Sequence, residues 1–247
     1  MIDIHCHILP EFDDGAASPE EAIAMAYMAV ETGVTAIVAT PHFPGKSSSL
    51  QHIGALLDRY EWLSRAVSAH RLPLKIYPGA EILCLPETPA LAEQRVLPTI
   101  GDTSYLLTEF FFDESFSRMD SQLRAIADCG YIPVVAHPER YHAIQSDPSL
   151  LKRWAENGYV LQLNKGSILG SFGLDPQDAA LAALEMKLAS LIASDAHSAT
   201  RRTPHMGALQ EWLDENCDSD YASILLNRNP ARLLAGRQIL RFPQSSF

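Results

Sequence analysis

The strongest constraint on the fold of this chain is a regular alternation of short β-like runs with longer helix-like segments. Seven apolar, β-branched runs alternate with amphipathic stretches, and no Ser/Gly linker or low-complexity tract divides the sequence. Parallel strands need crossovers of roughly a dozen residues, which are usually helical. An α/β barrel of 247 residues is routinely one unit. The pattern therefore predicts one domain over residues 1–247, with a parallel, closed or nearly closed barrel.

The individual elements follow from this periodicity and from capping signals. Ser18 can cap the first helix, Glu21 completes an S-x-x-E box, and Gly33 can end the helix. A doubly wound open sheet is the structural alternative, but the sequence contains neither GxGxxG after its first strand nor GxxxxGK[ST]. We predict strands at 1–5, 34–40, 74–81, 105–109, 132–137, 160–164 and 188–195. We predict helices at 18–33, 48–72, 120–129, 148–157, 176–187, 205–216, 221–226 and 230–234.

Residue types that bind metals gather where the predicted strands end, and the active sites of α/β barrels lie at these carboxyl ends. Residues two apart in an extended segment point to the same side, so His5 and His7 can face one cavity, and so can Asp195 and His197. The candidates are His5, His7, Asp14, His42, Glu81, Glu109, His137, Asp195 and His197. Nine groups exceed what one ion with about four to six ligands can use, so the sequence predicts about two or three ions.

Several residues near this set have simpler interpretations. Asp13 is interpreted as a turn or capping group, and Cys6 as a core residue rather than a nucleophile, because the sequence offers it no dedicated base. Any one of the histidines could instead be an ordinary buried residue. The aromatic residues Phe110, Phe111, Phe112 and Phe116 could belong to the core or line the mouth of the pocket, and the sequence leaves both alternatives open.

The donor set and two arginines indicate the chemistry. A mixed histidine and carboxylate site without cysteine suits Mn²⁺, Fe²⁺ or Zn²⁺ in a hydrolytic enzyme. Arg140 follows His137 by three residues, and Arg202 lies five beyond His197, so both can reach the same edge of the barrel. Guanidinium groups bind phosphate bidentately. This favours a phosphate ester as the substrate.

Charge and cysteine content restrict the partners and the compartment. Lys plus Arg number 19 against 30 Asp plus Glu, giving a net charge of −11, which argues against nucleic acid as a partner. The four cysteines form no CxxC pair, which favours reduced thiols. The first residues lack the apolar core of a signal peptide, and no apolar run is long enough to span a bilayer. We expect a cytoplasmic protein without membrane insertion.

A series of motifs resembles one enzyme family. DIHCHILP…DDG, TPHF, PGAEI, TEF, AHPERY, LNKGSILGSFG and ASDAH…RR, between Met1 and about Gly236, resemble the polymerase and histidinol phosphatase (PHP) superfamily. Within it, the bacterial capsule and exopolysaccharide protein-tyrosine phosphatases match best. The resemblance implies a distorted, TIM-like (β/α)7 barrel of the PHP fold. It also implies a manganese-dependent phosphoric monoester hydrolase that cleaves phosphotyrosine with a metal-bridging hydroxide, acting on a bacterial tyrosine autokinase of capsule or exopolysaccharide synthesis.

The same resemblance implies a ligand set for three divalent ions, most often Mn²⁺, with Fe or Zn as alternatives. One ion would take His5, His7, Glu81 and Asp195; a second Glu81, Glu109 and His137; and a third Asp14, His42 and His197. Arg140 and Arg202 would be the catalytic residues that hold the phosphoryl group. Glu11 and Phe12 depart from the family pattern, so their role at the pocket mouth is left open.

Other functions compete with this one. The chain could be a PHP phosphatase of a small metabolite such as histidinol phosphate. It could be a metal-dependent amidohydrolase, although such enzymes usually need a carboxylated lysine or a lone aspartate base, and Lys165 is the only lysine near a strand end. It could also be a non-catalytic, metal-bound docking protein. The sequence leaves the physiological substrate, the metal in the cell, any general acid and the oligomeric state open.

Overall fold

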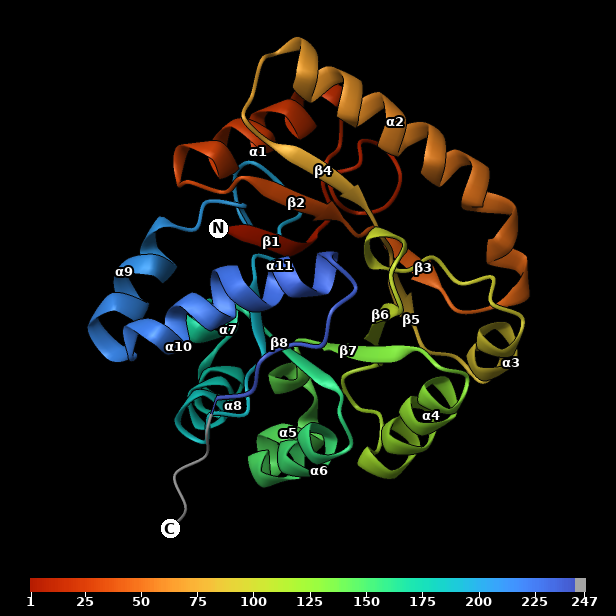
Figure 1. Cartoon of the computed structure of the whole chain (residues 1–247), viewed down its shortest axis with the longest axis vertical. Coiled ribbons are helices and arrows are strands. Elements are labelled where there is room, and N and C mark those ends of the chain that lie inside the picture. Colours follow the sequence, from red (N-terminus) through yellow and green to blue (C-terminus); the bar gives the residue numbers. More distant parts are fainter. Residues whose placement is uncertain (243–247) are drawn as a thin grey trace.

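Parallel strands alternate with helices throughout the computed structural model, which describes residues 1–242 (Figure 1). Every paired strand runs parallel to its neighbour, so the α/β class is confirmed. The strands are β1 (Ile2–Cys6), β2 (Ala36–Ala39), β3 (His42–Pro44), β4 (Lys75–Pro78), β5 (Glu81–Leu83), β6 (Tyr105–Glu109), β7 (Ile132–Ala136), β8 (Val160–Asn164) and β9 (Leu191–Ala193). The prediction of one domain over 1–247 is not tested by the fold, and its last five positions lie outside the described residues.

Two of the seven predicted strands are shorter than predicted, and each is followed by a second short strand that was not predicted as a separate element. The strand predicted at 34–40 contains β2 and is followed by β3, and the strand predicted at 74–81 contains β4 and ends at Glu81, the first residue of β5. Pro41 has no N–H to continue the first ladder. A Cβ on Gly79 would lie 2.7 Å from Val38 Cγ1, so the second break needs a glycine where the chain packs against the side chain of Val38. The breaks divide the strands between two sheets, ordered β1-β2-β4 and β3-β5-β6-β7-β8-β9.

The two sheets meet again beside β1, which gives the strands a distorted barrel arrangement. The Asp195 N–H donates to the His5 carbonyl at 2.9 Å, and the His7 N–H donates to the Ala196 carbonyl at 2.8 Å. The strand predicted at 188–195 extends only over β9, because Asp195 adopts a positive φ of 49° that a strand cannot accommodate. This junction places the chain after β9 next to the end of β1.

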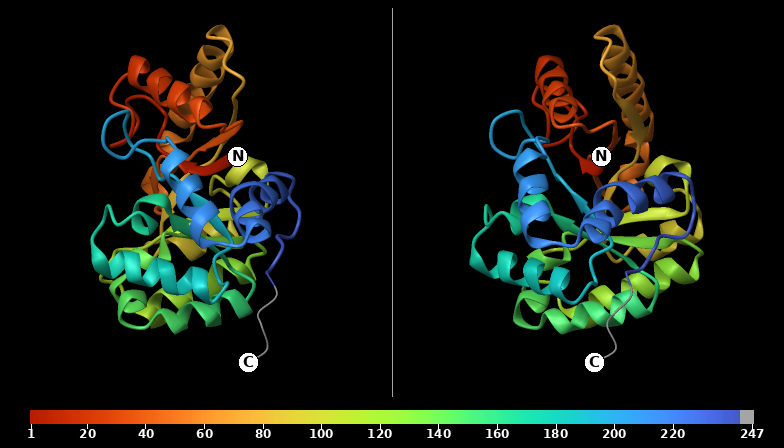
Figure 2. Two further views of the ribbon diagram at one scale, coloured as in Figure 1. Left: turned by 90° about the vertical axis from the view of Figure 1, so that its left-hand side faces the viewer. Right: turned by 60° about the vertical axis from the view of Figure 1, so that its left-hand side comes forward.

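Helices surround the strands. Figures 1 and 2 show α1 and α2 at one end of the molecule, over β1, β2 and β4, whereas α4, α5, α6 and α8 lie on the opposite side. The helices are α1 (Pro19–Glu31), α2 (Ile53–Ala69), α3 (Thr88–Glu93), α4 (Phe116–Asp128), α5 (His142–Ser146), α6 (Leu151–Glu156), α7 (Lys165–Ile168), α8 (Leu174–Glu185), α9 (Gly207–Asn216), α10 (Ser219–Ser223) and α11 (Asn229–Leu234).

The predicted helices exist, with changed ends. Ser18 caps α1 by accepting from the Glu21 N–H at 3.2 Å, and Gly33 follows the helix with a positive φ of 80°, as predicted. The segment predicted at 48–72 begins with a 3₁₀ turn before α2, and α4 begins at Phe116 rather than at residue 120. The short α3, α5 and α7 were not predicted, because about one turn carries too little periodicity to recognise.

The interior of the barrel is filled with apolar side chains below the strand ends. Ile4, Val38, Leu107 and Val134 come from four different strands and pack together in one fully buried cluster. Leu233 of α11 joins this cluster, so α11 closes the amino end of the barrel, in front of the strands in Figure 1. The carboxyl ends of the strands therefore form the accessible end at which polar residues can gather.

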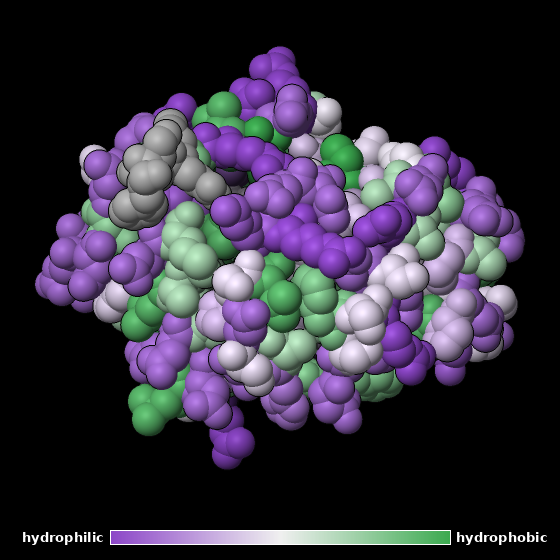
Figure 3. Space-filling view, turned by 90° about the horizontal axis from the view of Figure 1, so that it is seen from below, coloured by the Kyte–Doolittle hydropathy of each residue, from purple (hydrophilic) through white to green (hydrophobic). Residues whose placement is uncertain are grey.

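The outer surface is largely hydrophilic on the face seen in Figure 3, with small apolar areas between the polar residues. Isolated apolar residues on a surface are normal for globular proteins. Among the described residues, no helix combines the length and the apolar character that crossing a membrane requires.

Candidate metal centre

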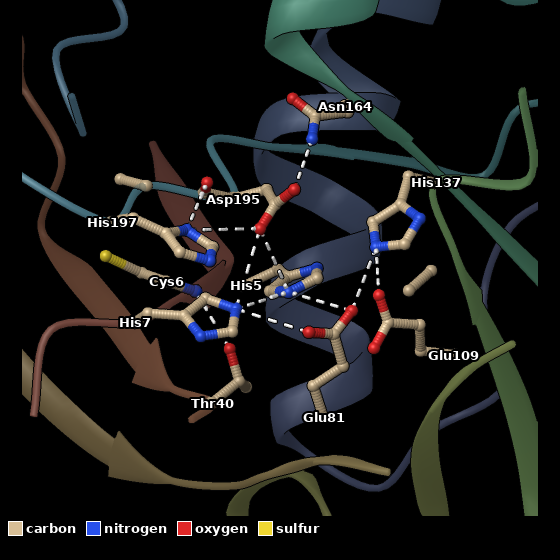
Figure 4. Close-up of polar contacts among 12 residues, drawn as sticks. His5, Cys6, His7, Thr40, Glu81, Glu109, His137, Asn164, Asp195 and His197 are labelled. Atoms are coloured by element: carbon tan, nitrogen blue, oxygen red, sulfur yellow. Dashed lines mark hydrogen bonds and ion pairs between the residues drawn. The ribbon is translucent and has the colours of Figure 1, made fainter. Parts of the chain in front are cut away.

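All nine metal-binding candidates lie together at the carboxyl ends of the strands. Some donors lie on strands β1, β3, β5 and β6, and the others lie on the segments that follow β1, β7 and β9. Figure 4 shows seven of the nine with their polar contacts. His42 was predicted in a loop, but it begins β3 and pairs with Glu81 of β5. The broken strands therefore have a functional consequence, since they place His42 directly beside the most central carboxylate.

Seven of the nine candidates form three overlapping groups, and within each group the donor atoms all lie within 4.8 Å of one another. The groups are His7, Asp14, His42 and His197; His5, His7 and Glu81; and His42, Glu81 and Glu109. His137 also reaches this centre, with Nε2 at 2.9 Å from Glu81 Oε1 and 3.6 Å from Glu109 Oε1. The resemblance places His7 and His42 in one ligand set each, but here His7 also lies in the group with Asp14 and His197, and His42 also lies in the group with Glu81 and Glu109. The assignment of residues to individual ions stays a prediction.

Neighbouring side chains fix the orientation of the histidine rings. His5 Nδ1 lies 2.8 Å from Gln162 Oε1, and His7 Nδ1 lies 2.7 Å from Asp13 Oδ2. An acceptor at Nδ1 holds the proton on that atom and leaves Nε2 free to bind a metal. The two Nε2 atoms lie 3.2 Å apart, next to Glu81 and Asp195.

Two buried carboxylate oxygens lack hydrogen-bond partners among the described residues. Glu81 Oε2 and Asp195 Oδ1 are both buried and receive no hydrogen bond; imidazole nitrogens lie next to them, His42 Nδ1 at 3.0 Å from Glu81 Oε2 and His5 Nε2 at 3.4 Å from Asp195 Oδ1. Leaving a buried carboxylate oxygen unpaired is costly unless a cation compensates it. The imidazole and carboxylate donors around these oxygens match those preferred by Mn²⁺, Fe²⁺ and Zn²⁺. The residues present therefore fit a centre of divalent ions.

The backbone is unusual at two of these positions. His137 has a φ of 33° and Asp195 a φ of 49°, both in the left-handed region that most residues avoid. Such conformations cost roughly 1–3 kcal/mol each and occur preferentially at functional sites. At both positions the strand ends and the side chain turns into the centre, so local strain accompanies the placement of the donor atoms.

The electrostatic environment changes how the donors hold protons. Burial alone would lower the pKa of His5, but the charges of Glu81 and Asp195 outweigh it and raise the pKa to about 9. Burial of His42 is likewise outweighed by its contacts with Glu109 and Glu81, which raise its pKa to about 11. For Asp195, burial is outweighed by His5 and other cationic neighbours, and its pKa is lowered. Without metal, the centre holds protons in place of cations.

We therefore expect divalent metals to bind more tightly as the pH rises from about 6.5 toward 9. The protons on His5 and His42 must leave before these nitrogens can bind a metal, so binding releases protons. Titration calorimetry of the metal-free protein with Mn²⁺, in two buffers of different ionisation enthalpy, measures this release. Binding that is independent of pH and buffer would contradict the expectation.

The same pKa values predict how the stability of the metal-free protein depends on pH. The folded pKa of His5 lies above the unfolded value of 6.5, so its contribution is complete below pH 6.5. This contribution is lost as the pH rises through about 9. Thermal unfolding of the metal-free protein at pH 6.5 and pH 9.5 should therefore show the lower melting temperature at the higher pH.

Both predicted arginines reach the same carboxylate. Arg202 Nη2 contacts Asp195 Oδ2, and Arg140 Nη1 lies 3.7 Å from the same oxygen. Arg202 Nη1 is also 3.3 Å from His197 Nε2. Two guanidinium groups thus lie at the edge of the centre, where they can bind an anion that also contacts the ions. Their side chains are partly exposed, so a ligand can reach them.

Sequence reasoning missed the residues that hold these groups in place. Phe172 lies beneath both guanidinium groups, 4.5 Å from Arg140 Cζ and 5.6 Å from Arg202 Cζ. The Asn164 side chain donates to Asp195 Oδ2. The AHPER, LNKGSILGSFG and SDAH motifs pointed to these segments, but nothing in one sequence distinguishes a supporting phenylalanine or amide from a core residue.

Three further interpretations can be compared with the structure. Asp13 forms the expected turn, with Oδ1 accepting from the Gly15 N–H at 3.0 Å, and it also orients His7. Cys6 is fully buried, and burial raises the pKa of its thiol well above the usual value, which supports a core residue. The aromatic run divides: Phe110 is buried, Phe111 and Phe112 are exposed, and Phe116 stacks on Trp154 at 4.9 Å.

Comparison with known proteins identifies the family. The model of the capsular polysaccharide synthesis family CpsB/CapC matches residues 1–235. The tyrosine-protein phosphatase YwqE of Bacillus subtilis is 35% identical over 243 residues, covering 98% of this chain and 95% of YwqE. The putative tyrosine-protein phosphatase CapC of Staphylococcus aureus is 35% identical over 204 residues, covering 82% of this chain and 79% of CapC.

Solved structures agree with this result. A crystal structure from work on YwqE of Bacillus subtilis and CpsB of Streptococcus pneumoniae, described as unique metal-dependent tyrosine phosphatases, matches with a TM-score of 0.88. Sequence identity is 34%, and the match covers 100% of this chain and 99% of that one. A putative histidinol phosphatase of Listeria monocytogenes, 11% identical with a TM-score of 0.50, covers 88% of this chain and shares the fold. The chain is therefore a member of the CpsB/CapC family of capsular polysaccharide synthesis proteins.

Proposed function

We propose that this protein is a metal-dependent protein-tyrosine phosphatase, a phosphoric monoester hydrolase whose ions are Mn²⁺. The observation that carries the proposal is the convergence of the nine donors with two guanidinium groups at Asp195. The names of the relatives and of the matching crystal structure support the same activity. The physiological substrate would be a bacterial tyrosine autokinase of capsule or exopolysaccharide synthesis, in the cytoplasm, and the working unit would be one domain.

The nine donors would hold three divalent ions around Glu81 and Asp195, whose unpaired oxygens already face the other donors. Bound there, such ions would supply a water deprotonated near neutral pH and positive charge toward phosphate oxygens. Asp13, Gln162 and Asn164 would keep the donors in place through the hydrogen bonds described above. The protein's own contribution is thus a preorganised set of donors.

Arg140 and Arg202 would hold the phosphoryl group of the substrate. Their guanidinium groups contact Asp195 and can exchange this contact for phosphate oxygens. Positive groups fixed at this position stabilise charge that develops during phosphoryl transfer. Arg140 is held on both faces, 4.3 Å from the Phe112 ring and 4.5 Å from the Phe172 ring, so little orientation has to be imposed when substrate binds.

The tyrosyl leaving group of phosphotyrosine can depart from a site that has no residue dedicated to protonating it. Tyrosyl oxygen has a pKa of about 10, so it departs more readily as an anion than an alkoxide does. Glu139 is a buried carboxyl near the centre: its Oε1 accepts from the Asn164 N–H at 2.9 Å, its Oε2 has no hydrogen-bond partner among the described residues, and burial raises its pKa. Because its side chain has no exposed surface, it does not face a substrate in this structure. This arrangement favours aryl over alkyl phosphate esters.

One competing function meets a specific obstacle. An amidohydrolase that used a carboxylated lysine would need Lys165 at the centre. Lys165 Nζ instead donates to the carbonyl of His205 at 2.9 Å and to that of Thr203, on the segment after Arg202. The amine is therefore committed to holding that segment. A non-catalytic docking role would not require nine converging donors and two arginines.

The substrate class tests the proposal. With Mn²⁺ added, kcat/KM for a phosphotyrosine peptide should exceed that for histidinol phosphate and for the matched phosphoserine peptide by more than about tenfold. The reason is the difference in leaving group together with the shape of the pocket. Release of inorganic phosphate gives all three rates in one assay. A higher kcat/KM for histidinol phosphate would establish the metabolite phosphatase instead.

A further inference from the structure

An apolar groove with a volume of about 320 Å³ lies directly beside the candidate metal centre. His42 and Glu109 of the centre form one end of it, and Pro44, Leu83, Phe111 and Phe112 form its walls. The donors and the groove thus share two residues. A molecule that placed its phosphate at the centre would have this groove as the nearest apolar surface.

Two phenylalanines of this groove are exposed. Phe111 is 54% and Phe112 37% exposed, whereas Phe110 before them is buried against Tyr141 with a centroid distance of 5.9 Å. Large apolar side chains left open beside a polar centre are typical of ligand-binding surfaces. The core contains only the first residue of the run; Phe112 contacts Arg140, and core packing does not explain the exposed Phe111.

The groove also adjoins the proposed phosphate-binding position. Arg140 Cζ lies 4.3 Å above the Phe112 ring, and the same ring is 6.1 Å from the ring of His137. A phosphate held by Arg140 would therefore have an aromatic wall at its side. The group attached to the ester oxygen of that phosphate would extend along this wall.

A second groove beside His42 has a different character. Its volume is about 600 Å³, and its lining is mixed: Phe12 and Phe43 are apolar, but Glu11, Lys46 and Arg59 carry charges. Arg59 and Glu11 lie 3.5 Å apart across it. An aromatic ring placed there would desolvate charged groups, whereas the apolar groove offers aromatic and aliphatic surfaces.

We propose that the apolar groove receives the phenyl ring of phosphotyrosine, and that Phe111 and Phe112 are specificity-determining residues for an aryl ester. This proposal rests on the proposed function, because it places the ring of that substrate. Offset or edge-to-face contact with the two phenylalanines would favour the ring. The shorter side chain of phosphoserine would leave the groove in contact with water.

The binding of two phosphonates tests the position of the ring without turnover. Benzylphosphonate and methylphosphonate carry the same anionic group and differ by the phenyl ring. With the Mn²⁺-loaded protein, calorimetry should give at least about tenfold tighter binding of benzylphosphonate. In Phe111→Ala this ratio should fall by about threefold or more, because one of the two phenylalanines that contact the ring is lost, while the affinity for methylphosphonate stays unchanged. Phe111→Leu should keep an intermediate ratio.

A matched control and two contrary outcomes complete the test. Tyr27→Ala removes an aromatic ring of similar exposure, 48%, from α1, away from the groove, and should leave the ratio unchanged. An unchanged ratio in Phe111→Ala would overturn the proposal. So would a ratio that falls in Phe12→Ala, at the second groove, but not in Phe111→Ala.

Failure of this inference is distinguishable from failure of the proposed function. If the wild-type protein hydrolyses phosphotyrosine, but the ratio of benzylphosphonate to methylphosphonate affinity does not depend on Phe111, the proposed function stands and the proposed position of the ring is wrong. A wild-type protein that does not hydrolyse phosphotyrosine with Mn²⁺ loses the proposed function itself, whatever the phosphonates do.

Discussion

Removing the divalent ions should abolish phosphotyrosine hydrolysis by this protein. We expect the rate to fall by roughly a thousandfold or more, since the ions would supply several kcal/mol of transition-state stabilisation. Side chains of the centre do not replace them, because in the metal-free protein His5 and His42 hold protons, and a protonated imidazole does not supply a water deprotonated near neutral pH. The measurement is phosphate release from a phosphotyrosine peptide before and after treatment with a chelator, together with the metal content of each sample.

Return of activity on adding Mn²⁺ would show that the loss is due to removal of the ions. Adding Mn²⁺ after removal of the chelator should return most of the activity, and the amount of Mn²⁺ bound at saturation tests the number of ions. Glu81→Gln provides a matched control, because it keeps the size of the side chain but removes one charge from the carboxylate common to two donor groups. Mn²⁺ should restore little activity to this variant. A metal-free sample that retains full activity would refute the metal-dependent mechanism.

The sequence predicted the position of the centre because strand ends can be located from periodicity. His5, Glu81 and Asp195 each stand at or next to the end of an apolar run, and parallel strands bring such ends to one edge. A one-residue error in a strand boundary leaves this result intact. The candidate donors therefore lie together even where the strands themselves are shorter than predicted, and their binding of metal stays a prediction.

The detailed geometry was beyond the reach of the sequence. His42 stands in a strand and not in a loop, because the chain breaks at Pro41 and pairs again with β5, a tertiary event that no local pattern shows. The contacts of His7 with two donor groups depend on ring orientation, which Asp13 sets. The contact of Gln162 in β8 with His5 could not be predicted either, because an isolated polar residue in an apolar run has many explanations.

The structure also shows where part of the negative charge of the chain lies. A net charge of −11 argues against a polyanion as partner, and the phosphate of a phosphoprotein is itself an anion. Four of the carboxylates, at Asp14, Glu81, Glu109 and Asp195, are gathered at the centre, where bound divalent ions would outweigh them. With three divalent ions bound, as proposed above, these acidic residues would thus lie in a pocket of net positive charge.

Replacing either arginine should then lower kcat/KM by about a hundredfold, equivalent to about 3 kcal/mol. Arg140→Ala and Arg202→Ala each remove a guanidinium group that faces Asp195 at the edge of the centre. Lysine at either position should recover part of the activity, because it restores the charge but not the bidentate geometry. Steady-state kinetics with a phosphotyrosine peptide, at fixed Mn²⁺, gives the comparison.

The neighbouring Arg201 is the matched control for these variants. It is exposed, and within residues 1–242 its one hydrogen bond is from its backbone N–H to Ser198 Oγ at 3.1 Å. Arg201→Ala should change kcat/KM by less than about twofold. Because Arg140 and Arg202 contact Asp195, the metal content of each variant must also be measured. A hundredfold loss with unchanged metal content assigns the guanidinium groups to the substrate, whereas a loss that follows the metal content would make them supports of the centre and contradict their role in binding phosphate.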